Sequence, residues 1–115
     1  MSVSAEYVEY IKELLGGFPD LHTKKYFGGV ALRSTHLGKD IQFATILGDV
    51  LYFVVDDISR PKYEAKGMKP FTYDKQSKTV VVKKWYTAPE ELFEDEVLMS
   101  EWAMEALEAS MRSIK

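Results

Sequence analysis

The chain has 115 residues, of which 46% are hydrophobic and 29% charged, and this composition is typical of one globular domain. Its 15 basic and 18 acidic residues give a formal net charge of −3, which does not favour attraction of the whole chain to nucleic-acid phosphates. It has no cysteine, so disulfides, thiolate nucleophiles and cysteine zinc sites are excluded. Residues 1–15 lack the basic start and unbroken apolar stretch of a signal peptide. No apolar run approaches the roughly 20 residues that span a bilayer, and we expect a cytoplasmic protein.

The first predicted element is a helix over residues 4–15. Ser4 is placed to cap it, and Val8, Ile11 and Leu15 recur at helical spacing. The pair Gly16-Gly17 ends this helix, because glycine adopts the left-handed conformation after a helix without a Cβ clash.

A β-rich stretch follows, and the short turns within it predict antiparallel neighbours, since parallel strands need a long crossover. Strict alternation along the third strand would place Ile41, Phe43 and Thr45 on one face. Gly28-Gly29 is expected to be a bend, a bulge or a close backbone approach. The four predicted strands cover residues 21–27, 30–34, 41–47 and 50–55.

The second half begins with a short predicted helix over residues 61–66, with Ser59 as its cap. A hairpin of strands 71–73 and 79–85 comes next. Thr87 has capping-box spacing to Glu90, which indicates another short helix, and Asp95 is placed to cap a final helix to about residue 112.

This order of elements predicts an α+β fold with two layers. One antiparallel sheet of about five to six strands is covered by helices on one face. We expect residues 1–115 to form a single domain.

The residues that carry catalysis or bind metals are sparse. His22 and His36 lie in different segments and lack metal-ligand spacing, and none of the serines stands in a glycine-flanked nucleophile elbow. Asp56, Asp57 and Arg60 form the nearest thing to a polar constellation. Adjacent strand residues point to opposite faces, so we interpret these three as shaping a turn, with Arg60 tying one aspartate by a salt bridge. We predict no catalytic residues, no cofactor and no metal.

Two segments combine lysines with aromatic residues, namely 24–27 and 83–86. Aromatic residues on a basic sheet can bind single-stranded nucleic acid, whereas alternation along a strand directs at least one ring of each pair into the core. Charge is also uneven, since residues 1–87 carry a net +3 and residues 88–115 a net −6.

The ordered motifs of the chain resemble the TfoX N-terminal domain family. Lys25, Tyr26, Phe27, Gly28 and Gly29 are similar to its basic-Met-Phe-Gly-Gly motif, with tyrosine in place of methionine. Further matches in order and spacing cover nearly the whole chain; they include Phe43-Ala44, residues 51–56, Arg60, Tyr63-Glu64, Gly67-Met68, residues 70–73, Trp85-Tyr86, Pro89, Leu92, Asp95 and Trp102-Ala103.

The resemblance implies a secretion-chaperone-like α+β fold and a role in bacterial regulation. The family's named members promote natural competence together with a cyclic-AMP-responsive transcription activator, and they carry a second, C-terminal helical domain that we do not expect within these 115 residues. The resemblance therefore implies a non-enzymatic regulatory or adaptor domain that binds a protein partner in transcriptional control. The partner would be a transcription activator or a separate C-terminal TfoX-like domain.

Two alternatives remain open. One is direct binding of nucleic acid through the lysine-aromatic strands, and the other is a small enzyme built around Asp56, Asp57 and Arg60. No membrane partner is expected. Because an antiparallel sheet leaves edge strands to be covered, we also expect a homodimer. The candidate interaction and motif residues are Lys25, Tyr26, Phe27, Gly28, Gly29, Arg60, Lys83, Lys84, Trp85 and Tyr86.

Overall fold

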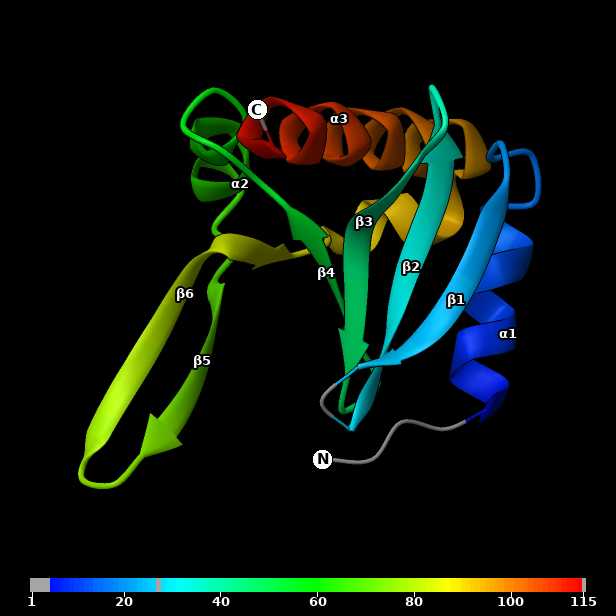
Figure 1. Ribbon diagram of the computed structural model, residues 1–115. Helices are drawn as coiled ribbons and strands as arrows, with labels where there is room; N and C mark the ends of the chain where they lie inside the picture. The colour runs from blue at the N-terminus through cyan, green and yellow to red at the C-terminus, as the bar shows by residue number, and fades with distance from the viewer. Residues whose placement is uncertain (1–4, 27, 115) are drawn as a thin grey trace.

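The computed structural model describes residues 5–26 and 28–114 (Figure 1). Ser4, the expected first cap, and Phe27, in the glycine motif, lie outside the described residues. The helices are α1 (Ala5–Leu14), α2 (Arg60–Ala65), the 3-10 helix η1 (Glu90–Glu94) and α3 (Glu96–Ile114). The strands are β1 (Leu21–Tyr26), β2 (Gly29–His36), β3 (Lys39–Leu47), β4 (Val50–Val54), β5 (Pro70–Lys75) and β6 (Lys78–Thr87). This is the predicted order of elements.

The strands form one six-stranded antiparallel sheet in the order β1-β2-β3-β4-β6-β5. Two of its hairpins close through Leu37-Gly38 and Gly48-Asp49, where both residues have positive φ. Such turns match the right-handed twist of the flanking strands. In Figure 1, α1, η1 and α3 lie behind the strands. The predicted α+β fold, with helices on one face of an antiparallel sheet, is confirmed.

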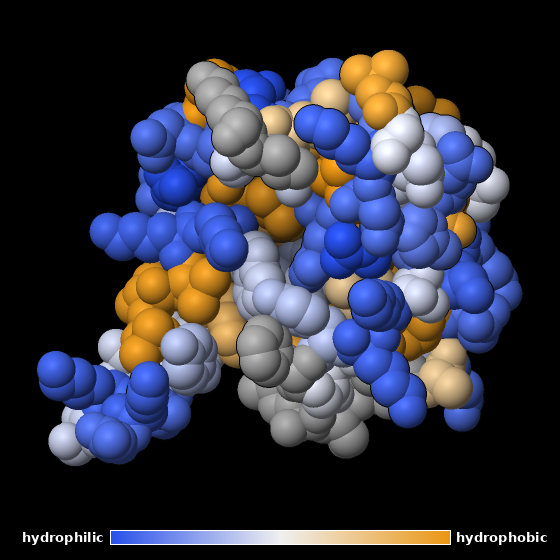
Figure 2. All heavy atoms as spheres, viewed as in Figure 1, coloured by the Kyte–Doolittle hydropathy of each residue, from blue (hydrophilic) through white to orange (hydrophobic). Residues whose placement is uncertain are grey.

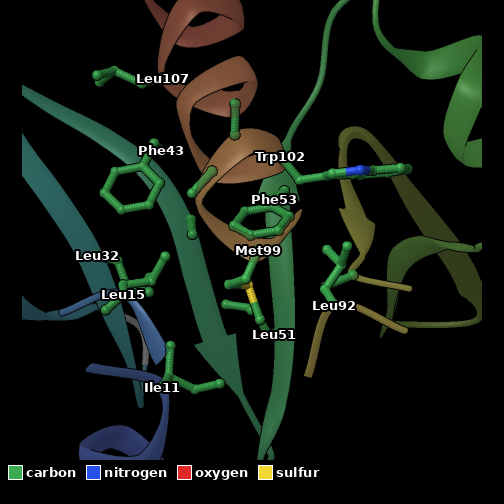
Figure 3. Close-up of a cluster of buried hydrophobic side chains, with 14 of the residues drawn as sticks. Ile11, Leu15, Leu32, Phe43, Leu51, Phe53, Leu92, Met99, Trp102 and Leu107 are labelled. Carbon is green, nitrogen blue, oxygen red and sulfur yellow. The ribbon is translucent and has the colours of Figure 1, made fainter. Parts of the chain in front are cut away.

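The main core lies between the sheet and these helices. Ile11 of α1, Phe43 of β3, Phe53 of β4 and Met99 of α3 are fully buried and gather in one apolar volume (Figure 3). Tyr63 of α2 packs edge-on against Trp102 of α3, with ring centroids 4.8 Å apart. A buried aromatic ring removes roughly 150–250 Å² from water, so this contact is a large part of what fastens α2 to α3.

The strict alternation expected along β3 is wrong, because β3 contains a bulge. Leu32 of β2 pairs with Ala44 and the next residue, Arg33, pairs with Gln42, so Phe43 is the extra residue. The bulge turns both Phe43 and Ala44 into the main core and moves Thr45 to the other face. Sequence alternation alone contains no signal for this shift.

The prediction that the Ser59 side chain caps α2 is also wrong. Ser59 makes no side-chain cap to this helix, and its hydroxyl instead accepts a hydrogen bond from the backbone N–H of Asp56. The Asp56 carboxylate accepts from the backbone N–H groups of Ile58 and Ser59 at 3.1 and 3.0 Å. Aspartate therefore shapes the turn that serine was expected to start.

Of the two helix caps predicted in the C-terminal part of the chain, one is wrong and the other is confirmed. Thr87 does not begin a capping box, because it is the last residue of β6 and its hydroxyl accepts from the backbone N–H of Lys69. Asp95 does cap α3, since its carboxylate accepts from the backbone N–H of Leu98 at 3.1 Å. Within the described part of the chain, no helix is both long and apolar enough to cross a membrane.

Replacing Gly29 with alanine should destabilise the fold. A Cβ at this position would collide with the backbone carbonyl of Ile46 and would also meet the side chain of Leu47. We expect Gly29→Ala to lower the free energy of unfolding by about 3 kcal/mol, measured by urea denaturation. Gly17→Ala is the matched control, because a Cβ there meets no atom within 4 Å. Equal stability of the two variants would contradict this account of Gly29.

Candidate functional site

A groove of about 470 Å³ opens between the main part of the sheet and the β5–β6 hairpin. We call the hairpin residues 70–82 the arm. The residues that line the groove are Tyr26, Leu47, Phe71, Tyr73, Val82, Lys84 and Trp85. All but Lys84 are apolar or aromatic. Figure 2 shows the arm standing away from the body, with hydrophobic side chains over its middle and hydrophilic ones at its tip.

The arm stands away because β6 bends. Its C-terminal part pairs with β4, where Val54 faces Trp85 and Phe53 faces Tyr86. On the other side Pro70 of β5 also faces Tyr86, but the next residue, Phe71, faces Val82. Residues 83–85 of β6 therefore have no counterpart in the register with β5. Extra residues on one strand of a pair form a bulge, and a bulge bends that strand. The bend turns the apolar side of the arm toward the body.

Five aromatic rings connect the two walls of the groove. Trp85 contacts Tyr26 of β1 and Phe71 of β5, with ring centroids 5.7 and 5.8 Å apart. Phe71 also contacts Tyr52 of β4 at 5.2 Å and Tyr73 at 5.9 Å. Burial in this apolar setting raises the pKa of the Tyr52 hydroxyl above its ordinary value. Trp85 is only 8% exposed, whereas Tyr73 is 43% exposed and marks the open side.

The stretch of the chain that contains the arm and the bend of β6 is the most positively charged part of this region. Residues 69–87 contain five lysines and one aspartate, a net +4 in a chain whose total is −3. Among these lysines, Lys84 is in the groove lining itself. The single acid, Asp74, accepts a hydrogen bond from the Thr79 hydroxyl within the arm.

The structure separates the predicted interaction residues into two groups. Tyr26, Lys84 and Trp85 come together in the groove lining. Tyr86 instead points to the main core, as strand alternation predicts, and its hydroxyl donates to Glu64 at 3.1 Å. Burial first, and then this bond, raise the pKa of Tyr86. Lys25 and Lys83 are exposed and are not among the lining residues.

Four lining residues were not among the predicted interaction residues: Leu47, Phe71, Tyr73 and Val82. The signal for Phe71, Tyr73 and Val82 is their spacing in the hairpin, since residues 71, 73 and 82 fall on one face once β5 and β6 are paired. No sequence signal predicts the bend that brings this face toward Leu47.

Asp56, Asp57 and Arg60 do not converge on a shared site. Arg60 pairs with Asp57, with Nη1 2.7 Å from the carboxylate, and the Asp57 side chain is 97% exposed. Asp56 pairs instead with Arg112 near the end of α3, with Nε 2.6 Å from the carboxylate. The predicted salt bridge from Arg60 to one aspartate thus runs to Asp57, while Asp56 connects the segment after β4 to α3 through Arg112, which sequence reasoning missed. Hydrogen bonding by Arg112 holds the pKa of Asp56 far below its ordinary range.

Both ring nitrogens of His22 lie close to oxygen atoms of neighbouring residues. His22 has Nδ1 3.0 Å from the Asp20 carbonyl oxygen and Nε2 2.7 Å from the Asp40 carboxylate. Both ring nitrogens thus lie within hydrogen-bond distance of oxygen atoms of the chain itself. Among the described residues, no group of three or more histidine, aspartate or glutamate side chains is arranged to hold a metal ion.

A family model described as the TfoX N-terminal domain matches residues 13–110. The chain belongs to the TfoX N-terminal domain family. The predicted resemblance is confirmed, and the match includes every residue that lines the groove. The family is not known as an enzyme family. No curated protein matches the chain.

Three motif residues of this TfoX N-terminal domain have clear structural roles. Gly29 allows the close approach to β3 described above, and Gly28 has a φ of 78° in the turn that precedes it. Arg60, besides its pair with Asp57, donates from Nε to the carbonyl of Lys83 at 3.1 Å. This bond fastens the start of α2 to the bent part of β6.

We expect Asp56→Asn to destabilise the domain by about 2 kcal/mol at neutral pH, because it leaves Arg112 without its charged partner. The folded pKa of Asp56 is depressed, so its contribution is complete above the unfolded pKa of about 3.9 and is lost as pH falls below it. Unfolding measured from neutral to acidic pH should show the difference between variant and parent shrinking below about pH 4. Asp57→Asn, at the exposed neighbour, is the control and should change stability little. A difference that does not depend on pH would contradict the charge-based explanation.

Proposed function

We propose that this TfoX N-terminal domain is a non-enzymatic regulatory or adaptor domain that binds another protein in transcriptional control. The observation that carries the proposal is the aromatic groove, an apolar concave surface beside an exposed arm. Apolar surface that is concave and rimmed by charge is typical of interaction sites. The family assignment supports a regulatory context.

The arrangement of the polar side chains also supports a non-enzymatic role. Catalysis by side chains requires an acid, base or nucleophile held within reach of a common reacting atom. The Asp56 carboxylate is held by Arg112 and two backbone N–H groups, and Asp57 extends into solvent. Among the described residues that line the groove, Lys84 is the only ionisable group other than tyrosine. This arrangement supports binding in preference to chemistry.

Direct binding of single-stranded nucleic acid is the second candidate. The observation that favours it is the presence of Lys84 beside Trp85 in a surface with a net charge of +4 over residues 69–87. It would require base stacking on exposed ring faces. Trp85, however, is 8% exposed and contacts Tyr26 and Phe71 at interplanar angles of 63° and 47°.

Affinity capture from the native bacterial host tests the proposed function. We expect the tagged chain to retain a specific protein partner after nuclease treatment, identified by mass spectrometry as a transcription activator or a TfoX-like C-terminal domain. Capture with the double variant Lys83→Glu/Lys84→Glu gives the comparison. If the well-expressed chain retains no specific partner even at low salt, the proposal is wrong.

Nucleic-acid binding has its own measurement. We expect no salt-sensitive affinity for single- or double-stranded DNA in a fluorescence titration at two salt concentrations. Contacts to phosphates release counterions, so real binding would weaken steeply as salt increases. Such a slope, reduced in the Lys83→Glu/Lys84→Glu variant, would favour the second candidate over the first.

A further inference from the structure

We infer that the groove binds an acidic, extended peptide segment that carries an aromatic or large aliphatic anchor. This inference rests on the proposed function and specifies the chemistry of the partner. The groove volume of about 470 Å³ falls within the range of roughly 300–1,000 Å³ that is usual for ligand sites. The walls of the groove consist of six apolar or aromatic side chains and one cation, Lys84. An apolar anchor of the peptide can therefore contact apolar side chains on both walls.

The anchor follows from the lining. Leu47 and Val82 are aliphatic, and Phe71 and Trp85 are aromatic and contact each other at an interplanar angle of 47°. A large apolar side chain placed among them would lose its contact with water and gain contacts on both walls. Tyr73, at 43% exposure, lies where such a side chain would enter.

The acidic character follows from charge complementarity. Lys84 faces the groove, and residues 69–87 carry a net +4. Residues 88–115, a range that includes η1 and α3, carry a net −6. An acidic segment is therefore attracted to the arm and repelled by the helical side, which orients it toward the groove.

The extended conformation follows from the position of β5. It is the last strand of the sheet, and its only described strand partner is β6. In Figure 1, β5 lies between β6 and the main body, so its second backbone edge faces the side of the groove. An extended segment beside β5 can pair with these backbone groups while alternate side chains meet Phe71 and Tyr73.

A binding titration with defined peptides tests this inference. The probe is a short fluorescein-labelled peptide of Asp and Glu residues with a central Trp and Leu. Two matched peptides replace its acids with Lys or its anchors with Ser. With the full chain, we expect each change in the peptide to weaken binding by about tenfold or more, measured by fluorescence anisotropy.

The chain offers two matched pairs of variants. Lys84 lines the groove and its neighbour Lys83 does not, although Lys→Glu changes the net charge equally at both. We expect Lys84→Glu to weaken binding of the acidic peptide by about tenfold and Lys83→Glu by no more than about twofold. Tyr73 and Val81 are exposed to similar extents, 43% and 46%, on opposite faces of the arm. Tyr73→Ser should weaken binding, and Val81→Ser should not.

Several outcomes would overturn the inference. These are no binding of the acidic peptide, equal binding of the acidic and Lys-containing peptides, or equal losses within either pair of variants. Salt-sensitive binding of an oligo(dT) strand that Lys84→Glu abolishes would assign the groove to nucleic acid. A dimer in light scattering that Lys84→Glu dissociates would assign it to a second copy, and either result overturns the peptide assignment.

The two proposals fail in different ways. If capture from the host retains a specific protein equally well with the parent, Lys84→Glu and Tyr73→Ser, the groove inference is wrong and the proposed function stands. If the parent chain captures no specific protein, the proposed function is wrong whatever the peptides show. Circular dichroism and thermal unfolding of each variant establish that it is folded before binding is compared.

Discussion

Strand β6 pairs antiparallel with β4 near its end and with β5 along its earlier part, and the groove depends on this double pairing. Near its end, Trp85 faces Val54 of β4, while Val82, three residues earlier, faces Phe71 of β5. The extra residues 83–85 bend the strand, and without the bend the arm would continue the sheet as a flat extension. Phe71 and Trp85 would then lie on an open surface, with no opposite wall at Tyr26 and Leu47.

The same bend connects the two sides of the sheet. Trp85 and Tyr86 are adjacent, so their side chains point to opposite faces, Trp85 toward the groove and Tyr86 toward the core. Tyr86 in turn contacts Tyr63 of α2, whose first residue, Arg60, donates to the carbonyl of Lys83 within the bend. The shape of the groove is thus coupled to how α2 packs.

The hydroxyl of Tyr63 is buried without a hydrogen-bond partner among the described residues, and burial raises its pKa. Packing at this junction is therefore maintained at the cost of one unsatisfied polar group.

The sequence was sufficient for the order of elements, the antiparallel pairing and the membership of the family, because these follow from local periodicity, turn residues and ordered motifs. It was insufficient where one strand of a pair contains extra residues. The bulge at Phe43 and the bend at residues 83–85 both change which face a side chain occupies, and both are set by pairing with a distant strand. The partner of Asp56 was missed for the same reason, since Arg112 is 56 positions away and only the fold brings it near. Of the groove, sequence reasoning found the lysine-aromatic segments and missed the hairpin face that completes it.

The separation of charge in this domain has a physical consequence for binding. The acidic residues of η1 and α3 lie on the helical layer, whereas the lysines of residues 69–87 surround the bend and the arm. A neutral arrangement of the same groups would leave a ligand to find the groove by its apolar surface alone, and apolar contacts have little directional preference. With charges separated, the long-range field would orient the acidic partner inferred above, and the aromatic groove would then contact its anchor side chain. In that mode of binding, orientation and recognition are assigned to different residues.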